Sequence, residues 1–403
     1  LMVKVPFSPP HIDNKIITEV VDALQSGWIT TGPKTKEFER RLASFVGISN
    51  VLCVSSNSAG LELMLRWFGV QPGDEVIVPA YTYCATANVV VHCGATPVMV
   101  DVNPDFNIAV ENVKKAITPK TKVIMPVDIG GFPCDYDELI SLVKEEKIKS
   151  QFTPQTEEQN RLGRILILSD SAHSIGAWYK GKRAGSMADL SVFSFHAVKN
   201  LTTAEGGAIC LNLPQPFDNQ ELYKKLCVMS LHGQSKDALA KTQIGNWRYD
   251  VEYAGYKCNM PDVLAAMGLV ELDRYEEILN RRQQIFDRYS EAFSRYPCFE
   301  IPKYINKNKT SSFHVYLLRI KDITESERDE IMQKIFEQEV SVNVHFIPLP
   351  MLTAYKSRGY DISQYPITYQ NYSREISLPV YYTLTDEQVE TVIEAVLKSC
   401  KCK

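Results

Sequence analysis

The stretch that decides the fold is residues 165–211, which read ILILSDSAHSIGAWYKGKRAGSMADLSVFSFHAVKNLTTAEGGAICL. It contains apolar runs that predict three buried strands, at 165–169, 190–195 and 207–211. Two polar connections that carry glycine join these strands. Short apolar runs of this kind are typical of a mainly parallel sheet that is covered on both faces. The stretch therefore predicts an α/β fold with the sheet at its centre.

Polar residues follow two of these strands where the strands end. Asp170 comes directly after the first strand, and Lys199 follows the second by four residues. In open α/β sheets, ligands lie beyond the carboxyl ends of the strands. A carboxylate there can keep a heteroaromatic nitrogen protonated, and a desolvated lysine can lose its proton and attack an aldehyde. These are the two requirements of pyridoxal 5'-phosphate (PLP), so the sequence predicts this cofactor.

Two motifs in this stretch are more specific than either residue alone. They are SDSAHSIGA (169–177) and SVFSFHAVKNLTTAEGGA (191–208), and they resemble the signature of the DegT/DnrJ/EryC1/StrS family. The members of that family are fold-type-I PLP-dependent aminotransferases that act on nucleotide-linked keto sugars. The resemblance extends from about Gly27 to beyond Pro379. It implies a large domain (1–255) with a seven-stranded, mainly parallel sheet and a smaller C-terminal α/β domain (256–403).

The resemblance also implies which residues hold the cofactor. Lys199 would form the Schiff base with PLP and then move the proton between the substrate and the cofactor, while Asp170 would pair with the pyridinium nitrogen. The other implied positions are Ser58, Ala59 and Ser194 at the phosphate, Tyr83 stacked on the ring, His173 behind the aspartate or a cofactor oxygen, and Asn259 at the phosphate of a neighbouring subunit. From residue type alone, His173 and Tyr83 could equally be core residues, and Asn259 could cap a helix.

Polar residues at 55–58 precede a predicted helix that runs to about Phe68. Their side chains are good helix caps, and a helix start can bind phosphate through its free N–H groups. By itself this pattern predicts only a cap, and the resemblance is what favours a phosphate loop. Asn57 occupies a position where the family usually has glycine, which leaves the geometry of the turn open. We expect Thr82 and Thr86 to support the following loop.

Other polar residues are weaker candidates. Asp128 lies where family members have a His or Asp near the cofactor ring, although a capping or turn role is equally consistent. His345 lies where the family often has a histidine close to the active site, but Pro350 replaces a second histidine of that loop. Lys257 and Arg248 are candidates for binding the diphosphate of a nucleotide sugar.

Composition excludes several classes of protein. The chain has 403 residues, 45% of them hydrophobic, and a net charge of -4. This balance does not suggest a nucleic-acid partner, and no apolar run is long enough for a membrane span. Ten cysteines scattered along the chain fit reduced thiols and a cytoplasmic location. Cys400 and Cys402 lie in a lysine-rich tail that we expect to be solvated, with no metal, and the polar segment 150–163 predicts a surface loop.

The resemblance implies a homodimer with shared active sites, in which glutamate donates an amino group to a nucleotide-linked keto sugar. A branch of the family that dehydrates sugars has histidine in place of Lys199, so the lysine favours transamination. Two alternatives stay open. One is another fold-type-I PLP enzyme that acts on amino acids, such as a lyase or desulfurase, and the other is a non-catalytic regulatory protein with the same fold.

Overall fold

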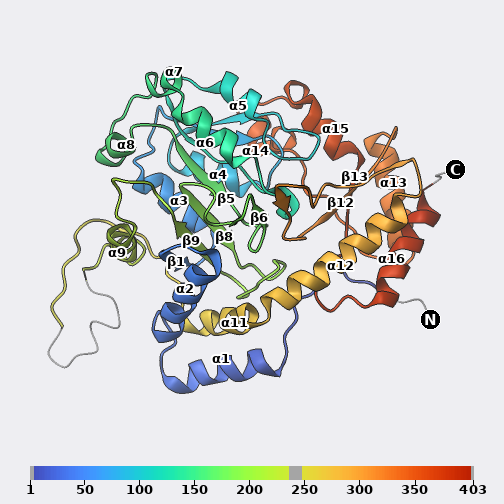
Figure 1. Ribbon diagram of the computed structural model, residues 1–403, viewed down its shortest axis with the longest axis horizontal. Helices are drawn as coiled ribbons and strands as arrows, with labels where there is room; N and C mark the ends of the chain where they lie inside the picture. The colour runs from blue at the N-terminus through green and yellow to red at the C-terminus, as the bar shows by residue number, and fades with distance from the viewer. Residues whose placement is uncertain (1–3, 236–246, 401–403) are drawn as a thin grey trace.

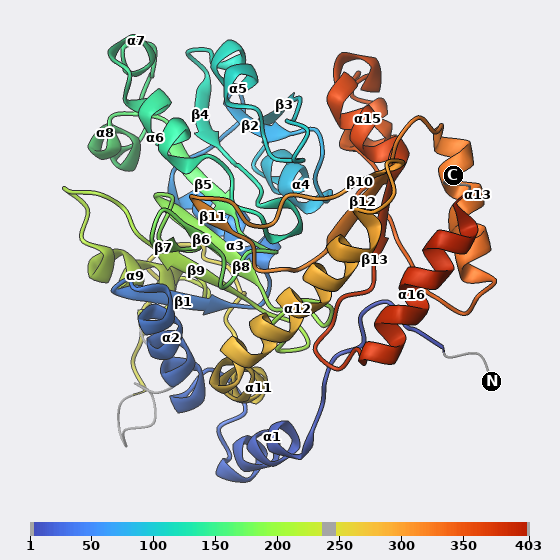
Figure 2. The ribbon, with the colours of Figure 1, turned by 45° about the vertical axis from the view of Figure 1, so that its right-hand side comes forward.

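The computed structural model describes residues 4–235 and 247–400. Its centre is a seven-stranded sheet (Figure 1), with the strand order β1-β9-β8-β5-β4-β2-β3 (Figure 2). The strands are β1 (Asn50–Val54), β2 (Glu75–Pro79), β3 (Thr96–Val100), β4 (Thr121–Ile124), β5 (Leu166–Asp170), β8 (Leu190–Ser194) and β9 (Gly207–Leu211). β9 is antiparallel to both of its neighbours, and the pairs from β8 across to β3 are parallel. The predicted α/β fold with a seven-stranded, mainly parallel sheet is confirmed.

The three strands predicted from residues 165–211 are β5, β8 and β9, and every residue in them is buried. Asp170 belongs to β5 as its last residue, where it pairs with Val192 of β8. Its N–H donates to the carbonyl oxygen of Pro126 (2.9 Å). The sheet therefore holds the backbone of the predicted cofactor-binding aspartate from both sides.

Helices cover the sheet and continue beyond its β1 edge. α3 and α4 pack against each other and the sheet, α2 packs on β1, and α11 packs on α1 and α2 (Figure 2). These helices and the others of this region are α1 (Asn14–Ser26), α2 (Pro33–Val46), α3 (Asn57–Trp67), α4 (Ala85–His92), α5 (Val110–Ala116), α6 (Tyr136–Lys144), α7 (Glu146–Lys149), α8 (Glu157–Leu162), α9 (Asn219–Met229) and α11 (Asp262–Asp273). Three short strands, β6 (Trp178–Tyr179), β7 (Lys182–Arg183) and β11 (Lys309–Thr310), form a small separate sheet.

A second apolar core lies toward the C-terminus. The long helix α12 (Tyr275–Phe293) connects the region of α11 with this core (Figure 2). The core lies around a three-stranded antiparallel sheet and two helices. The strands are β10 (Phe299–Glu300), β12 (Tyr316–Ile320) and β13 (Glu375–Leu378), and the helices are α13 (Glu325–Phe336) and α16 (Asp386–Ser399). Between α13 and β13 lie α14 (Thr353–Lys356) and α15 (Pro366–Arg374). The division of the chain at residues 255 and 256 stays a prediction.

The expectation of a surface loop at 150–163 is wrong in part, because α8 occupies its second half. Thr156 caps this helix by accepting a hydrogen bond from the N–H of Gln159 (3.3 Å). The side chain of Gln159 is fully buried and donates to the carbonyl oxygen of Phe68 (2.9 Å). A threonine followed three residues later by glutamine is a helix-start pattern, and here it pins the segment to the end of α3.

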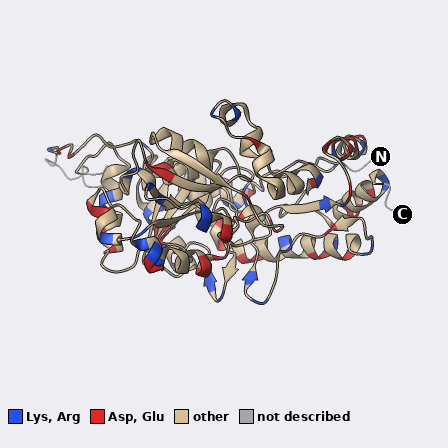
Figure 3. Ribbon diagram, turned by 90° about the horizontal axis from the view of Figure 1, so that it is seen from above, with Lys and Arg blue, Asp and Glu red and all other residues tan. Residues whose placement is uncertain are grey.

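Charged residues of both signs are mixed, since Lys and Arg are interspersed with Asp and Glu along the ribbon (Figure 3). Eight cysteines of the described residues are free thiols, whereas Cys298 is disulfide-bonded. Cys400 is buried rather than solvated, and Cys402 lies outside the described residues. No helix within residues 4–235 and 247–400 is both long and apolar enough to span a bilayer.

Candidate active site

A cavity of about 350 Å³ lies at the carboxyl ends of β5 and β8. The first turn of α3, the loop after β2, the segment after β8 and the segment around His345 contribute to its wall. The cavity brings together most of the residues predicted to hold a cofactor, namely Ser58, Tyr83, Asp170, His173, Ser194 and Lys199. Ala59 and Asn259 do not line it.

Asp170 is buried in the cavity wall and accepts three hydrogen bonds. Asn57 Nδ2 donates to its Oδ1 (3.1 Å), Thr86 Oγ1 donates to its Oδ2 (2.8 Å), and the N–H of Ala172 donates to Oδ1 (3.2 Å). Burial raises the pKa of Asp170, while these donors and the nearby Lys199 favour its ionised form. Thr86 therefore does more than support its loop, and Asn57 supplies a donor that the usual glycine would lack.

Lys199 is the amine of the cavity. Its Nζ forms no hydrogen bond or ion pair with any residue in the described part of the chain. Burial lowers its pKa to about 8, and the charge of Asp170 acts in the opposite direction. A substantial fraction of this amine is consequently neutral near physiological pH, which makes it a nucleophile.

Histidines form one side of the cavity. Nδ1 of His173 accepts a hydrogen bond from the N–H of Gly130 (3.2 Å), so its proton is on Nε2. The ring of His173 lies against the ring of His314, with 4.4 Å between their centroids. Burial lowers the pKa of both rings well below the usual value, and Lys199 adds to this effect. Both histidines are therefore neutral.

His314 was not singled out in the sequence. The structure starts β12 at Tyr316, so His314 lies in the segment before the strand. Its Nδ1 bonds to Oδ1 of Asn200 (2.8 Å), the residue after Lys199. A single histidine in an apolar run is not distinctive, and only this long-range contact with Asn200 reveals its place in the site.

The start of α3 offers donors to an anion. Ser56 caps the helix by accepting from the N–H of Ala59 (3.0 Å), whereas the N–H groups of Asn57 and Ser58 have no acceptor among the described residues. A Cβ added to Gly207 would lie 2.6 Å from the backbone nitrogen of Asn57. Glycine at this position lets β9 pack closely against the helix start, which fixes the position of these free N–H groups, and such groups can bind a phosphate.

Tyr83 lies at the mouth of the cavity, where 60% of its surface is exposed. Its ring is 5.7 Å from the ring of Phe346, and Phe346 stacks on His173. The exposure excludes the interpretation of Tyr83 as a core residue. Phe346, which the sequence analysis did not single out, extends the aromatic wall toward the histidines.

Two other candidates lie outside the cavity. Asp128 is buried and accepts hydrogen bonds from Tyr136 Oη (2.7 Å) and Ser174 Oγ (2.7 Å), so it has the structural role of a turn residue. Asn259 lies beside the end of β1 and donates to Thr31 Oγ1 (2.6 Å). It does not line the Lys199 cavity of its own chain.

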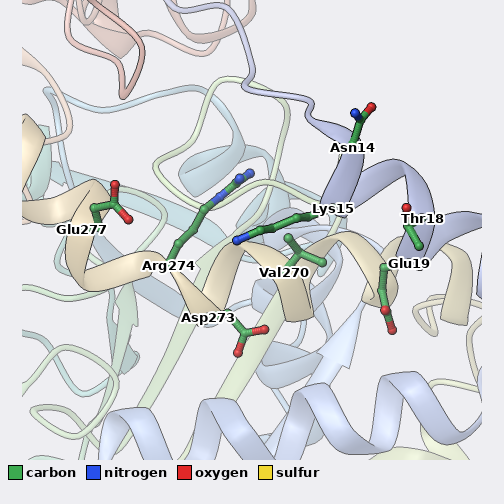
Figure 4. A pocket seen from close by; sticks show the side chains of 8 residues that line it. All are labelled: Asn14, Lys15, Thr18, Glu19, Val270, Asp273, Arg274 and Glu277. Carbon is green, nitrogen blue, oxygen red and sulfur yellow. The ribbon is translucent and has the colours of Figure 1, made fainter.

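A wider hollow of about 650 Å³ lies between α1 and the junction of α11 and α12 (Figure 4). Figure 4 shows Lys15 reaching from α1 toward the turn between α11 and α12 that carries Arg274. Arg274 is paired with Asp13 (2.6 Å) and with Glu271 (2.5 Å). None of the predicted cofactor residues lines this hollow, so the chemistry of the site belongs to the smaller cavity.

The residues present in the smaller cavity fit PLP. Asp170 offers a carboxylate for a pyridinium nitrogen, Lys199 an amine for an aldehyde, and Tyr83 a flat surface for a ring. The free N–H groups at the start of α3 and the hydroxyl of Ser194 suit a phosphate. The donor set thus matches each part of this cofactor.

Comparison with known proteins decides the family. The model of the DegT/DnrJ/EryC1/StrS aminotransferase family matches residues 10–151 and 156–397. The chain belongs to this family. The gap in the match falls within the segment that leads into α8.

Its relatives include sugar aminotransferases and a protein of polysaccharide synthesis. The chain is 36% identical to the spore coat polysaccharide biosynthesis protein SpsC of Bacillus subtilis, over 97% of this chain and 96% of that protein. The putative sugar aminotransferase Spr1654 of Streptococcus pneumoniae in its PLP form is 46% identical, with a TM-score of 0.93 over 99% of this chain and 100% of that one. PseC of Helicobacter pylori, an aminotransferase involved in the biosynthesis of pseudoaminic acid, is 27% identical, with a TM-score of 0.86 over 98% of this chain and 99% of that one.

This DegT/DnrJ/EryC1/StrS member is therefore a PLP-dependent aminotransferase of the sugar aminotransferase family. The predicted family, enzyme class and cofactor are confirmed, and the alternative of a non-catalytic regulatory protein is excluded.

Proposed function

We propose that this aminotransferase moves an amino group from glutamate to a nucleotide-linked keto sugar. The observation that carries the proposal is the amine of Lys199, which has no partner among the described residues and shares the cavity with the hydrogen-bonded carboxylate of Asp170. The family match, the role of SpsC in polysaccharide biosynthesis and the role of PseC in pseudoaminic acid biosynthesis support a sugar as the acceptor. Glutamate and the nucleotide linkage follow from the resemblance of the motifs to the family.

The cavity residues divide the work between them. PLP supplies an aldehyde that carries the amino group and a ring that accepts electrons when it is bound. Asp170 keeps the ring nitrogen protonated, and its two side-chain donors hold the carboxylate in place. Lys199 would hold the aldehyde through its neutral amine, and when free of it would move a proton at the substrate carbon.

The remaining predicted residues bind and orient the cofactor in this proposal. Ser58, Ala59 and Ser194 hold the phosphate, with Ala59 contributing through the helix start, where Ser56 accepts a hydrogen bond from its N–H. Tyr83 covers one face of the ring, and His173 lies behind Asp170 as a neutral side chain. Neither Lys257 nor Arg248 lines the cavity of its own chain. Both stay candidates for binding the diphosphate.

We also propose a cytoplasmic homodimer in which Asn259 reaches the phosphate of the partner's site. Apolar side chains on and near α1 support a partner surface, because Ile17 (50%), Leu24 (53%) and Ile29 (58%) are exposed. Chains carrying Lys199→Ala and chains carrying Asn259→Ala test the sharing of sites. Mixed dimers of these two inactive chains should regain activity, since one site then has both native residues, whereas no regain would place Asn259 in the site of its own chain.

The visible absorption spectrum of the purified enzyme tests the main proposal. The band of bound PLP should disappear on addition of glutamate as the amino form of the cofactor accumulates, and Lys199→Ala should lack this response. Adding a nucleotide-linked keto sugar should then restore the band. A band that glutamate does not change would contradict the donor, and formation of a cleavage product from an amino acid would favour a lyase or desulfurase.

A further inference from the structure

Three side chains behind the cavity form a hydrogen-bonded series from a buried carboxyl group to an imidazole. The hydroxyl of Ser377 bonds to Oε1 of Glu375 (2.6 Å), and Nδ1 of His345 bonds to the same hydroxyl (2.8 Å). The other carboxyl oxygen, Oε2, accepts the backbone N–H of His345 (3.1 Å). Glu375 and Ser377 have no exposed surface. The function described above uses none of these contacts.

His345 is held so that one ring nitrogen is left for the cavity. Its ring stacks on Phe7 (5.6 Å, 19°), and its carbonyl oxygen accepts a hydrogen bond from the hydroxyl of Tyr81. Nδ1 is engaged by Ser377, whereas Nε2 has no hydrogen-bond partner among the described residues. Because His345 lines the cavity beside Lys199, Nε2 is the atom that a bound substrate can meet.

Counting protons along the series gives two arrangements. When Glu375 is ionised, the Ser377 hydroxyl donates to it and accepts from Nδ1–H, which leaves Nε2 as a bare acceptor. When Glu375 is protonated, its O–H donates to Ser377, the serine hydroxyl donates to a bare Nδ1, and Nε2 carries the hydrogen. The second arrangement holds one proton more than the first. To reach it, Nε2 gains a proton, Nδ1 passes its proton to Ser377, and Ser377 passes its own proton to Glu375.

We propose that Glu375 is a positioning residue that acts through Ser377 to set whether His345 presents an acceptor or a donor to the cavity. The meaning of this relay rests on the proposed amination of a keto sugar. Exchange of oxygen and nitrogen at a carbonyl carbon needs a proton for the departing oxygen and an acceptor for a proton of the attacking nitrogen. A histidine whose Nε2 changes between a proton donor and a proton acceptor can serve both needs in turn.

The charges around Glu375 allow it to hold or release a proton. Arg319 on β12 and Arg328 on α13 face it, together with the phenol of Tyr81. Neither arginine pairs with its carboxyl group, because Arg319 is bonded to Glu300 and Asn371 and Arg328 to backbone carbonyl oxygens and Asp329. Burial raises the pKa of Glu375 to about 8, against the effect of its hydrogen bonds and the two arginines. His345 itself stays neutral, because burial and Lys199 lower its pKa to about 3.

Nitrogen NMR of the PLP-loaded enzyme, labelled with ¹⁵N-histidine, tests the proposal without any sugar. The chain has seven histidines, and loss of a signal in His345→Gln assigns the right one. We expect the ratio of the Nδ1–H form to the Nε2–H form of His345 to rise at least tenfold between about pH 6 and pH 10. A ratio that does not change with pH would overturn the proposal.

The isosteric variant Glu375→Gln makes the test sharper. Its amide oxygen must accept the fixed backbone N–H of His345, so its NH₂ group faces Ser377 and the serine hydroxyl can only donate to Nδ1. His345 should then carry its proton on Nε2 at every pH. A variant that still titrates like the wild-type enzyme would overturn the relay.

Variants at Ser377 distinguish a relay from a purely structural contact. Ser377→Ala removes the hydroxyl and should abolish the pH response of the tautomer ratio, whereas Ser377→Thr keeps the hydroxyl and should preserve it. In Glu375→Gln, the pH profile of kcat/KM should lose the limb that the titration of Glu375 produces in the wild-type enzyme. An enzyme that fails to aminate any keto sugar but shows the tautomer response would contradict the proposed function and leave the relay intact.

Discussion

Asn57 Nδ2 lies 3.1 Å from Asp170 Oδ1, so the first residue of α3 holds a carboxylate 113 positions further along the chain. The same amide nitrogen also donates to the carbonyl oxygen of Val192 (2.8 Å), which fixes the orientation of the side chain. The helix start that we assign to the phosphate is thereby tied to the group that we assign to the ring nitrogen. The two ends of the proposed cofactor site are built as one unit.

Thr86→Val should weaken PLP binding about tenfold, because it removes the hydroxyl that donates to Asp170 Oδ2 with almost no change of shape. A hydrogen bond to a charged group contributes about 1.5–3 kcal/mol, and part of that supports the pairing with the cofactor. Titration of the apoenzyme with PLP measures the change. Thr82→Val is the matched control, since Thr82 contacts Thr86 and not Asp170, and an equal loss in both variants would contradict the role of the hydroxyl.

The rate at which the apoenzyme captures PLP should rise with pH and level off above about pH 8. Burial lowers the pKa of Lys199 to about 8, so the ammonium form dominates below this pH and cannot attack an aldehyde. Stopped-flow absorption between about pH 6 and pH 10 measures the midpoint. In Lys199→Ala, PLP can react only with the other lysines, and the rate of that reaction should continue to rise toward about pH 10. A wild-type profile that coincides with that control would contradict the shifted pKa.

Ala204→Gly should stabilise the enzyme by up to about 1 kcal/mol. Ala204 is exposed and has a φ of 67°, in the left-handed region where a Cβ is unfavourable and glycine is not. Its side chain makes no buried contact that the substitution would remove. Chemical denaturation of both forms measures the difference. Ala208→Gly, in the buried strand β9, should instead destabilise, and a loss of stability in both variants would contradict strain at residue 204.

Glu375→Gln should gain stability relative to the wild-type enzyme as the pH rises. Burial raises the folded pKa of Glu375 to about 8, whereas the unfolded value is about 4.3. The stability that this group contributes is complete below the unfolded pKa and is lost as the pH rises through the folded pKa. The difference between the two proteins should therefore grow between about pH 4 and pH 8, by at most on the order of 5 kcal/mol.

Denaturation at several pH values within this window provides the comparison. Glu394→Gln is the control, because Glu394 is on the exposed face of α16 with 66% of its side chain accessible. Its stability difference from the wild-type enzyme should stay constant. A constant difference for Glu375→Gln as well would contradict the raised pKa of the buried carboxyl group.

Much of the central sheet was predictable because its signal is local. β9 begins and ends at the predicted residues, and β5 and β8 differ by one residue at their ends. Buried strands of a parallel sheet are nearly continuous apolar runs, so a few adjacent residues are enough to reveal them. The segment 150–163 was misread because it is polar, and its helix depends on the burial of Gln159 against α3.

The sequence by itself determined the family, the cofactor chemistry and the position of Asp170 and Lys199 at the ends of strands, because motifs and strand periodicity lie within short stretches of chain. Only the tertiary structure revealed which distant groups control them. Asn57 and Thr86 on Asp170, His314 on Asn200, and Glu375 and Ser377 on His345 are pairs that no local pattern connects. A hydrogen bond depends on distances of about 3 Å between atoms, and the topology of the sheet decides which distant residues come that close.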